Sequence, residues 1–91
     1  MEGLNVAHFA EIKNDIVVNV INVSNADVDN LPFPESEPVG QEYLTSLGLT
    51  GTWLQTSYNN NFRGVYAGIG FSYDVVKDIF VAPIQPIPNP E

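Results

Sequence analysis

Two short apolar runs open the chain, with turn residues between them. Residues 6–12 (VAHFAEI) are a candidate for a short strand. Residues 16–23 (IVVNVINV) are mostly β-branched, which suits a pleated strand. Residues 13–15 (KND) are predicted to form a turn, because Asn and Asp tolerate the left-handed backbone conformation. The pattern predicts a β-hairpin. Its second strand is apolar on both sides, so we expect that strand to be central and covered on both faces.

The middle of the chain predicts a long connection. Residues 24–40 are polar and acidic and contain three prolines, which keep the backbone extended. A connection of this length is unusual in a small domain. We expect it to wrap its own domain or to reach a neighbour, with Leu31 and Phe33 as anchors.

Residues 38–47 form the one helix candidate. We expect Ser36 or Glu37 to cap its start. A helix of about ten residues does not stand alone in water, so it is predicted to pack on the sheet. The apolar face that would pack consists of Tyr43, Leu44 and Leu47.

The second half of the chain predicts further short strands. Residues 52–57 read as a strand with Trp53 and Leu54 on opposite faces, and residues 58–61 as a turn. The remaining extended segments are predicted at residues 65–67, 69–73 and 79–82, of which the last two pair as a hairpin.

These elements together predict a mainly β fold, a small twisted antiparallel sheet or partly open barrel with one short α-helix. We expect one β-rich domain over residues 6–83. An N-terminal arm (residues 1–5) and a proline-rich tail (residues 84–91) are predicted to flank it. Ninety-one residues without cysteine give a modest core and no disulfide. Small domains commonly gain support from assembly, so we expect a homo-oligomer or many copies on a lattice.

Charge and composition narrow the partners. The formal net charge of −8 opposes binding to nucleic acid and to anionic membranes. No apolar run approaches a membrane span, and the N-terminus shows no signal peptide. One histidine and no cysteine argue against a zinc site, and we expect no cofactor.

Three features suggest a catalytic, calcium-binding or nucleotide-binding site, but none of them fits the pattern that such a site requires. His8 has no visible nucleophile beside it, so a structural role is favoured over catalysis. The spacing that starts at Asn25 resembles a calcium loop, but Asn30 and Ser36 replace the required Gly and Glu. The glycines of residues 64–70 lack the order and the following helix of a nucleotide fingerprint. We therefore expect no enzyme activity.

Aromatic residues between positions 53 and 80 are the remaining candidates for function. About four of the seven are expected in the core, because aromatics dominate small cores. The loop of residues 58–63 (YNNNFR) has the composition of a protein interface. In such interfaces Tyr and Arg are the usual anchor residues, and Asn supplies adaptable hydrogen bonds. A protein partner is favoured over a carbohydrate. The predicted interface residues are Trp53, Tyr58, Asn60, Phe62, Arg63 and Tyr66.

Several of these blocks resemble one group of proteins. The blocks AHFAEI (residues 7–12), GTWLQTSYN (residues 51–59) and AGIGFSYD (residues 67–74) resemble the AHFAEI-like, GTWxQTSYN and AGIGxxYD blocks that occur in the same order in short proteins from the structural regions of tailed-phage genomes, many of them marine. The resemblance covers most of residues 6–83 and implies a virion protein with no catalytic residues. The chain differs from that group at both ends.

The resemblance implies a structural component of a phage virion, found in the host cytoplasm during assembly. A capsid decoration or cement protein, bound to the major capsid protein or another virion protein, is the first expectation. Edge strands, the arm and the tail would make its contacts. The alternative is a module of the tail or fibre that binds host surface carbohydrate through residues 58–63.

Overall fold

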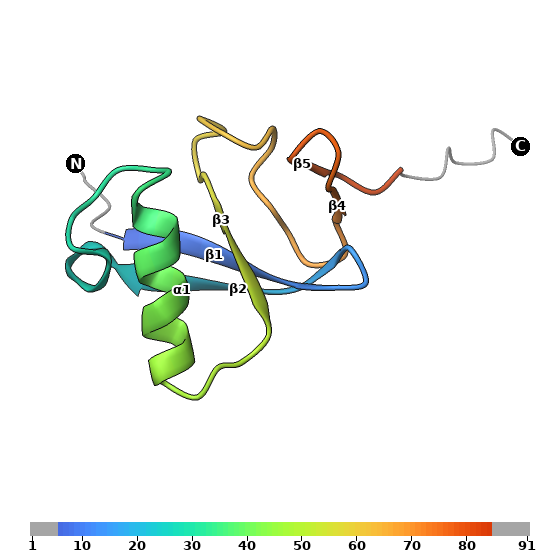
Figure 1. Ribbon diagram of the computed structural model, residues 1–91. Helices are drawn as coiled ribbons and strands as arrows, with labels where there is room; N and C mark the ends of the chain where they lie inside the picture. Colours follow the sequence, from blue (N-terminus) through green and yellow to red (C-terminus); the bar gives the residue numbers. More distant parts are fainter. Residues whose placement is uncertain (1–5, 85–91) are drawn as a thin grey trace, which may run out of the picture.

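Five antiparallel strands form one sheet in the order β3-β1-β2-β4-β5, which curls into a half-barrel beside one α-helix (Figure 1). The structure is a computed structural model and describes residues 6–84. The predicted fold class is confirmed. Along the chain the elements are β1 (Val6–Lys13), β2 (Ile16–Ser24), the 3-10 helix η1 (Asn25–Val28), α1 (Ser36–Ser46), β3 (Thr52–Thr56), β4 (Ser72–Asp74) and β5 (Ile79–Val81).

The predicted first hairpin is present as β1 and β2. Asn14 and Asp15 close it with φ angles of 52° and 62°, the left-handed backbone that a tight hairpin turn requires. Within the ladder, Glu11 pairs with Asn19 and the next residue pairs with Val17. Val18 is therefore an extra residue on β2, a bulge that bends the strand and strengthens its twist.

Strand β1 is the centre of the core, because both of its faces are covered. Alternate side chains of β1 point to opposite sides of the sheet, and each side has its own apolar cluster. The cluster under α1 contains Ala7, Phe9, Val23, Val28, Leu44 and Trp53. The cluster on the other face contains Ala10, Ile12, Val17, Ala67 and Phe80.

Helix α1 packs on the first of these faces through a glycine. A Cβ added to Gly40 would lie 2.2 Å from Cζ of the fully buried Phe9, so only glycine lets the helix come this close. Leu44 is buried beneath the helix, as predicted. Leu47 was predicted on the same face, but it is 55% exposed because the helix has already ended at Ser46.

The start of α1 also differs from the prediction. The helix begins at Ser36, two residues early, and its N-cap Glu35 makes no side-chain hydrogen bond to it. The predicted caps have other partners. The Ser36 hydroxyl donates to Oε1 of Gln55 at 2.6 Å, and the Glu37 carboxylate bonds to β3. Both side chains tie the helix to the sheet instead of closing its own first turn.

The prediction that β2 is covered on both faces is wrong. Ile16 and Val18 are 41% and 39% exposed, and Val17 and Val23 are the only fully buried residues of the strand. Ile16 points to the face opposite the buried Val17, and neither Ile16 nor Val18 belongs to an apolar cluster. Strand β4 pairs with β2 at Ile16 alone, so it lies beside only the beginning of β2.

The last two strands are a hairpin, as predicted, but each has only three residues. Residues 65–67, predicted as extended, are not a strand. The chain meets the sheet there through a single parallel bridge between Gly64 and Phe80. The predicted arm at residues 1–5 and nearly all of the predicted tail lie outside the described residues.

Candidate binding surfaces

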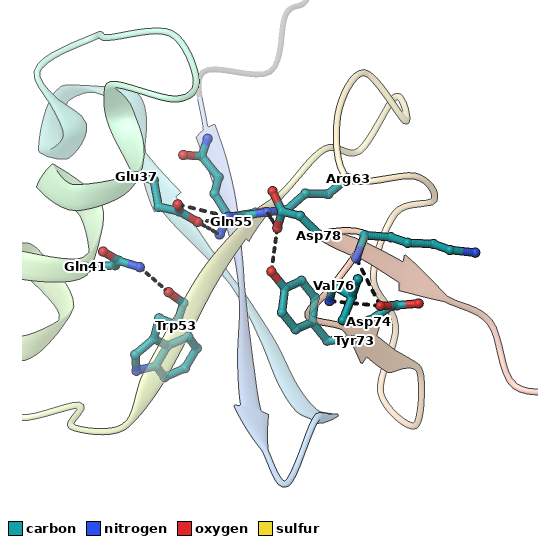
Figure 2. Close-up of polar contacts among 10 residues, drawn as sticks. Glu37, Gln41, Trp53, Gln55, Arg63, Tyr73, Asp74, Val76 and Asp78 are labelled. Atoms are coloured by element: carbon teal, nitrogen blue, oxygen red, sulfur yellow. Dashed lines mark hydrogen bonds and ion pairs between the residues drawn. The ribbon is translucent and has the colours of Figure 1, made fainter.

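The outer edge of β3 is closed by side chains (Figure 2). Nε2 of Gln41 donates to the carbonyl of Trp53 at 2.6 Å. The N–H of Gln55 donates to Oε2 of Glu37 at 2.8 Å, and Nη1 of Arg63 donates to the Gln55 carbonyl at 3.0 Å. Pairing of another strand at these groups would have to displace three side chains. Strand β3 is therefore a less favourable place for the predicted contacts through edge strands.

Arg63 joins three parts of the fold. It forms an ion pair with Glu37 of α1, and its Nε donates to Oδ1 of Asp78 at 2.8 Å. Its side chain is only 9% exposed. Burial disfavours the charged guanidinium, but hydrogen bonds and charge from Glu37 and Asp78 outweigh this and raise the pKa of Arg63. Arg63 was predicted as an interface anchor, but its guanidinium is occupied inside the molecule.

Tyr73 extends this network, since its hydroxyl donates to Oδ1 of Asp78 at 2.5 Å. Burial and this hydrogen bond raise the pKa of Tyr73 to about 12. In the other direction, the hydrogen bond from Tyr73, helped by Arg63, lowers the pKa of Asp78 against the effect of burial. The phenol and the carboxylate thus stabilise each other's usual state at neutral pH.

An alkaline titration checks this arrangement. A phenol whose folded pKa is raised contributes stability that is fully present below about pH 10 and lost as pH rises through about 12. Subtracting the phenolate absorbance of Tyr73→Phe from that of the wild type should isolate a tyrosine with a pKa of about 12. Asp78→Asn should lower this pKa but leave it raised, because burial is the larger cause. A Tyr73 phenol that titrates at the ordinary tyrosine pKa of about 10 would contradict the network.

The edge of β5 is also occupied within the described chain. The N–H of Phe80 donates to the Arg63 carbonyl at 2.9 Å, so the segment before Gly64 lies along the outer side of β5. The two end strands of the sheet are thus both covered at their centres.

Strand β2 is different, because half of it has an open outer edge. Backbone groups of successive residues in an antiparallel sheet point to opposite neighbours. The backbone N–H and C=O of Gln55 point away from β1. The backbone groups of its partner Phe9 therefore point the other way, toward β2, where Phe9 pairs with Ile21. Val20 and Asn22, on either side of Ile21, therefore direct their backbone N–H and C=O groups away from β1.

Strand β4 does not reach that part of the edge. The backbone of Val17 exchanges 2.8 Å hydrogen bonds with the segment before β4. Within residues 6–84, no backbone hydrogen bond reaches the outer side of residues 19–23. The N–H of Val20 is taken by Oδ1 of Asn19 at 3.0 Å. The carbonyl of Val20 and both backbone groups of Asn22 are left facing outward.

An aromatic cluster lies where β1 begins and β3 ends. The rings of His8 and Tyr58 stack with centroids 5.7 Å apart, and Tyr66 lies 5.3 Å from each, nearly perpendicular. The hydroxyl of Tyr66 is 3.3 Å from Nδ1 of His8. Burial lowers the pKa of His8, opposed by a hydrogen bond with Asn22, so the imidazole is neutral at pH 7.

The predicted interface residues therefore fall into separate environments. Tyr58 is exposed and Tyr66 half-buried in the aromatic cluster, and Asn60 holds the loop by accepting the Tyr66 N–H at 2.7 Å. Phe62 stacks on Phe33 at 3.7 Å, as expected of an anchor of the long connection, whereas Leu31, the other predicted anchor, is 40% exposed.

Trp53 was predicted at the interface but belongs to the core. It is 4% exposed under α1, and its indole N–H donates to the carbonyl of Leu49 at 3.1 Å. Of the seven aromatic residues between positions 53 and 80, only Trp53 and Phe80 are fully buried, whereas about four were predicted to be. The sequence reasoning missed His8 and Gln55 as members of a surface site. His8 lies beside Tyr58, whereas the Gln55 side chain lies on the helix-covered face at the same end of the sheet. Both places depend on the pairing of β1 with β3, which no local pattern gives.

The described part of the chain brings together no group of three residues suited to hold a metal ion. None of its helices has the length and apolar character to cross a membrane. No protein-family model, curated protein or solved structure matches this chain.

Proposed function

We propose that this protein is a structural component of a tailed-phage particle, a decoration protein bound in many copies to the capsid shell. The observation that supports this best is the open edge of β2 at residues 19–23. An exposed edge of this kind accepts an extended segment of another chain as an added strand. The partner we propose is an arm or loop of the major capsid protein or another virion protein.

The edge suits strand addition in both length and character. Five residues at about 3.4 Å each give roughly 17 Å of ladder, enough for a short added strand. The Val20 carbonyl and the Asn22 backbone supply hydrogen bonds at the centre. Val18, 39% exposed, offers an apolar side chain at one end. Such a contact is weak alone, but repetition over a lattice gives high avidity.

The net charge of the protein and its sequence resemblance also support a place on the outside of a phage capsid. A net charge of −8 opposes contact with packaged nucleic acid, so a position on the outside of the shell is favoured. The blocks at residues 7–12, 51–59 and 67–74 resemble proteins from phage structural regions. The exposed Val75 and Val76, in the turn between β4 and β5, add an apolar contact outside the strand ladder.

Asn22→Pro tests the proposal directly. Proline lacks an N–H and is tolerated where the N–H of an edge strand faces solvent, as it does at Asn22. The variant should therefore fold but bind purified capsids at least about tenfold more weakly, a loss of about 1.4 kcal/mol. Asn22→Thr is the matched control, since it removes the same side chain and keeps the N–H. It should bind as the wild type does.

Cosedimentation with heads that lack the protein gives these affinities, and heating the decorated heads shows whether the protein stabilises them. Wild type and Asn22→Thr should raise heat resistance and Asn22→Pro should not. If Asn22→Pro folds and binds with wild-type affinity, strand addition at β2 is excluded. If the wild-type protein does not bind to heads and binds only to tails, the role as a capsid decoration protein is excluded.

A further inference from the structure

The aromatic cluster borders an open pocket of about 180 Å³ between the start of β1 and the end of β3. Its walls come from β1, β3 and the loop that follows β3. The lining residues are Val6, Ala7, His8, Gln55, Thr56, Ser57, Tyr58, Asn59 and Phe62. Pockets for drug-sized ligands are about 300–1,000 Å³, so this one suits a single small ring.

We propose that this pocket binds one neutral pyranose ring of a carbohydrate. The role does not depend on the decoration function, because the pocket and the outer edge of β2 use different groups. Three features of the pocket carry the inference: an ordered aromatic platform, unused hydrogen-bond donors and the absence of charge among its lining residues.

The platform is Tyr58. It is 56% exposed although His8 stacks on one face of its ring, so the ring is held in place and still offers surface to a ligand. The face of an aromatic ring is electron-rich, and the C–H bonds on the flat side of a pyranose are weakly positive. Contact with Tyr66 fixes the platform further. Little ordering free energy remains to be lost when a sugar binds.

The donors line the same pocket, with the Gln55 side chain on the helix-covered face of the sheet and the His8 side chain on the other face. Gln55 is 7% exposed and its Oε1 accepts from Ser36, but its Nε2 donates no hydrogen bond within residues 6–84. The hydroxyls of Thr56 and Ser57 each accept a backbone N–H at 2.9 Å. A hydroxyl that accepts still has its own proton to donate. Buried donors without partners are costly, and the hydroxyl oxygens of a sugar satisfy them.

The lack of charge defines the class of sugar. No Lys, Arg, Asp or Glu lines the pocket, and its one histidine is neutral at pH 7. A chain with a net charge of −8 also repels anions at long range. The ligand is therefore a neutral hexose or N-acetylhexosamine unit, not a sialic acid or a sugar phosphate.

Titration of the ¹⁵N-labelled full chain with single sugars tests this. The probes are methyl β-glucopyranoside, methyl β-galactopyranoside, methyl α-mannopyranoside and N-acetylglucosamine, with sialic acid as the anionic comparison. At least one neutral sugar should shift the amides of His8 and residues 55–59. Tyr58→Ala should weaken that sugar's affinity at least about tenfold, and Tyr58→Phe should preserve it.

Asn59→Ala gives a second variant that does not touch the aromatic cluster, and it should weaken binding about threefold. Val76→Ser, a change at an exposed residue of another loop, should have no effect on sugar binding. The proposal is overturned if no neutral sugar shifts these amides at about 50 mM, where even about 2 kcal/mol of binding would be detected. It is also overturned if sialic acid binds equally well, or if Tyr58→Ala binds like the wild type. Tyr58→Ala should leave capsid binding unchanged, which separates this test from that of Asn22→Pro.

Discussion

Arg63→Ala is expected to lower the free energy of unfolding by about 3 kcal/mol, the cost of removing one partner from a buried ion pair. The side chains of Arg63 and Glu37 are only 9% and 14% exposed, so solvent screens the lost pair weakly. The substitution also uncovers the Gln55 carbonyl on the edge of β3. Arg63 has a φ of 57°, and the free-energy cost of this left-handed backbone is the same for Ala as for Arg. The change in stability therefore reports the loss of the side-chain contacts alone.

Urea unfolding followed by circular dichroism measures this loss. Lys77→Ala is the matched control, because it removes the same charge from an exposed residue and should change stability by less than about 0.5 kcal/mol. Arg63→Lys should recover only part of the stability, since an ammonium group cannot span Glu37, Asp78 and the Gln55 carbonyl together. If Arg63→Ala and Lys77→Ala unfold at the same urea concentration, Arg63 does not hold the fold together.

Gly40→Ala is expected to destabilise the protein by about 2 kcal/mol, although Ala is the better helix former by about 1 kcal/mol. The added methyl group would lie 2.2 Å from Cζ and 2.7 Å from Cε1 of Phe9. The Phe9 ring is fully buried, so it can move only by disturbing the cluster under α1. Overpacking of this kind costs about 1–3 kcal/mol, and here the whole contact between helix and sheet must widen.

Thermal unfolding should show a melting temperature lower by about 10 °C for Gly40→Ala. Glu42→Ala, on the exposed side of the same helix, should leave it nearly unchanged. Combining Gly40→Ala with Phe9→Leu should lose less than the sum of the two single changes, because the smaller side chain makes room for the methyl group. Strict additivity, or a stabilising Gly40→Ala, would show that the contact is not tight.

The parts of the fold that the sequence predicted are those with local causes. The β-branched run at residues 16–23 and the turn residues before it give the first hairpin. Leu44 lies beneath the helix as its spacing predicts, and Trp53 and Leu54 pack in clusters on opposite faces of the sheet. Each of these follows from neighbours a few positions away.

The parts that could not be predicted depend on distant contacts. The apolar residues of β2 gave no sign that β4 would pair with Ile16 alone and leave the second half of the strand open. Arg63 and Glu37 are 26 positions apart, and nothing near either one identifies its partner. The composition of the loop at residues 58–63 was typical of an interface, but it could not distinguish Tyr58, which is exposed, from Arg63, which is used internally.

Hydrogen exchange of the protein free and bound to capsids tests most directly whether β2 receives a strand from a virion partner. The Asn22 amide faces outward without a backbone partner in residues 6–84, so it should exchange rapidly in the free protein and slowly on the capsid. The amide of Gln55 on β3, already bonded to Glu37, should not change. Protection of Asn22 on binding is the predicted result. An Asn22 amide that exchanges equally fast in free and fully bound protein would contradict the account.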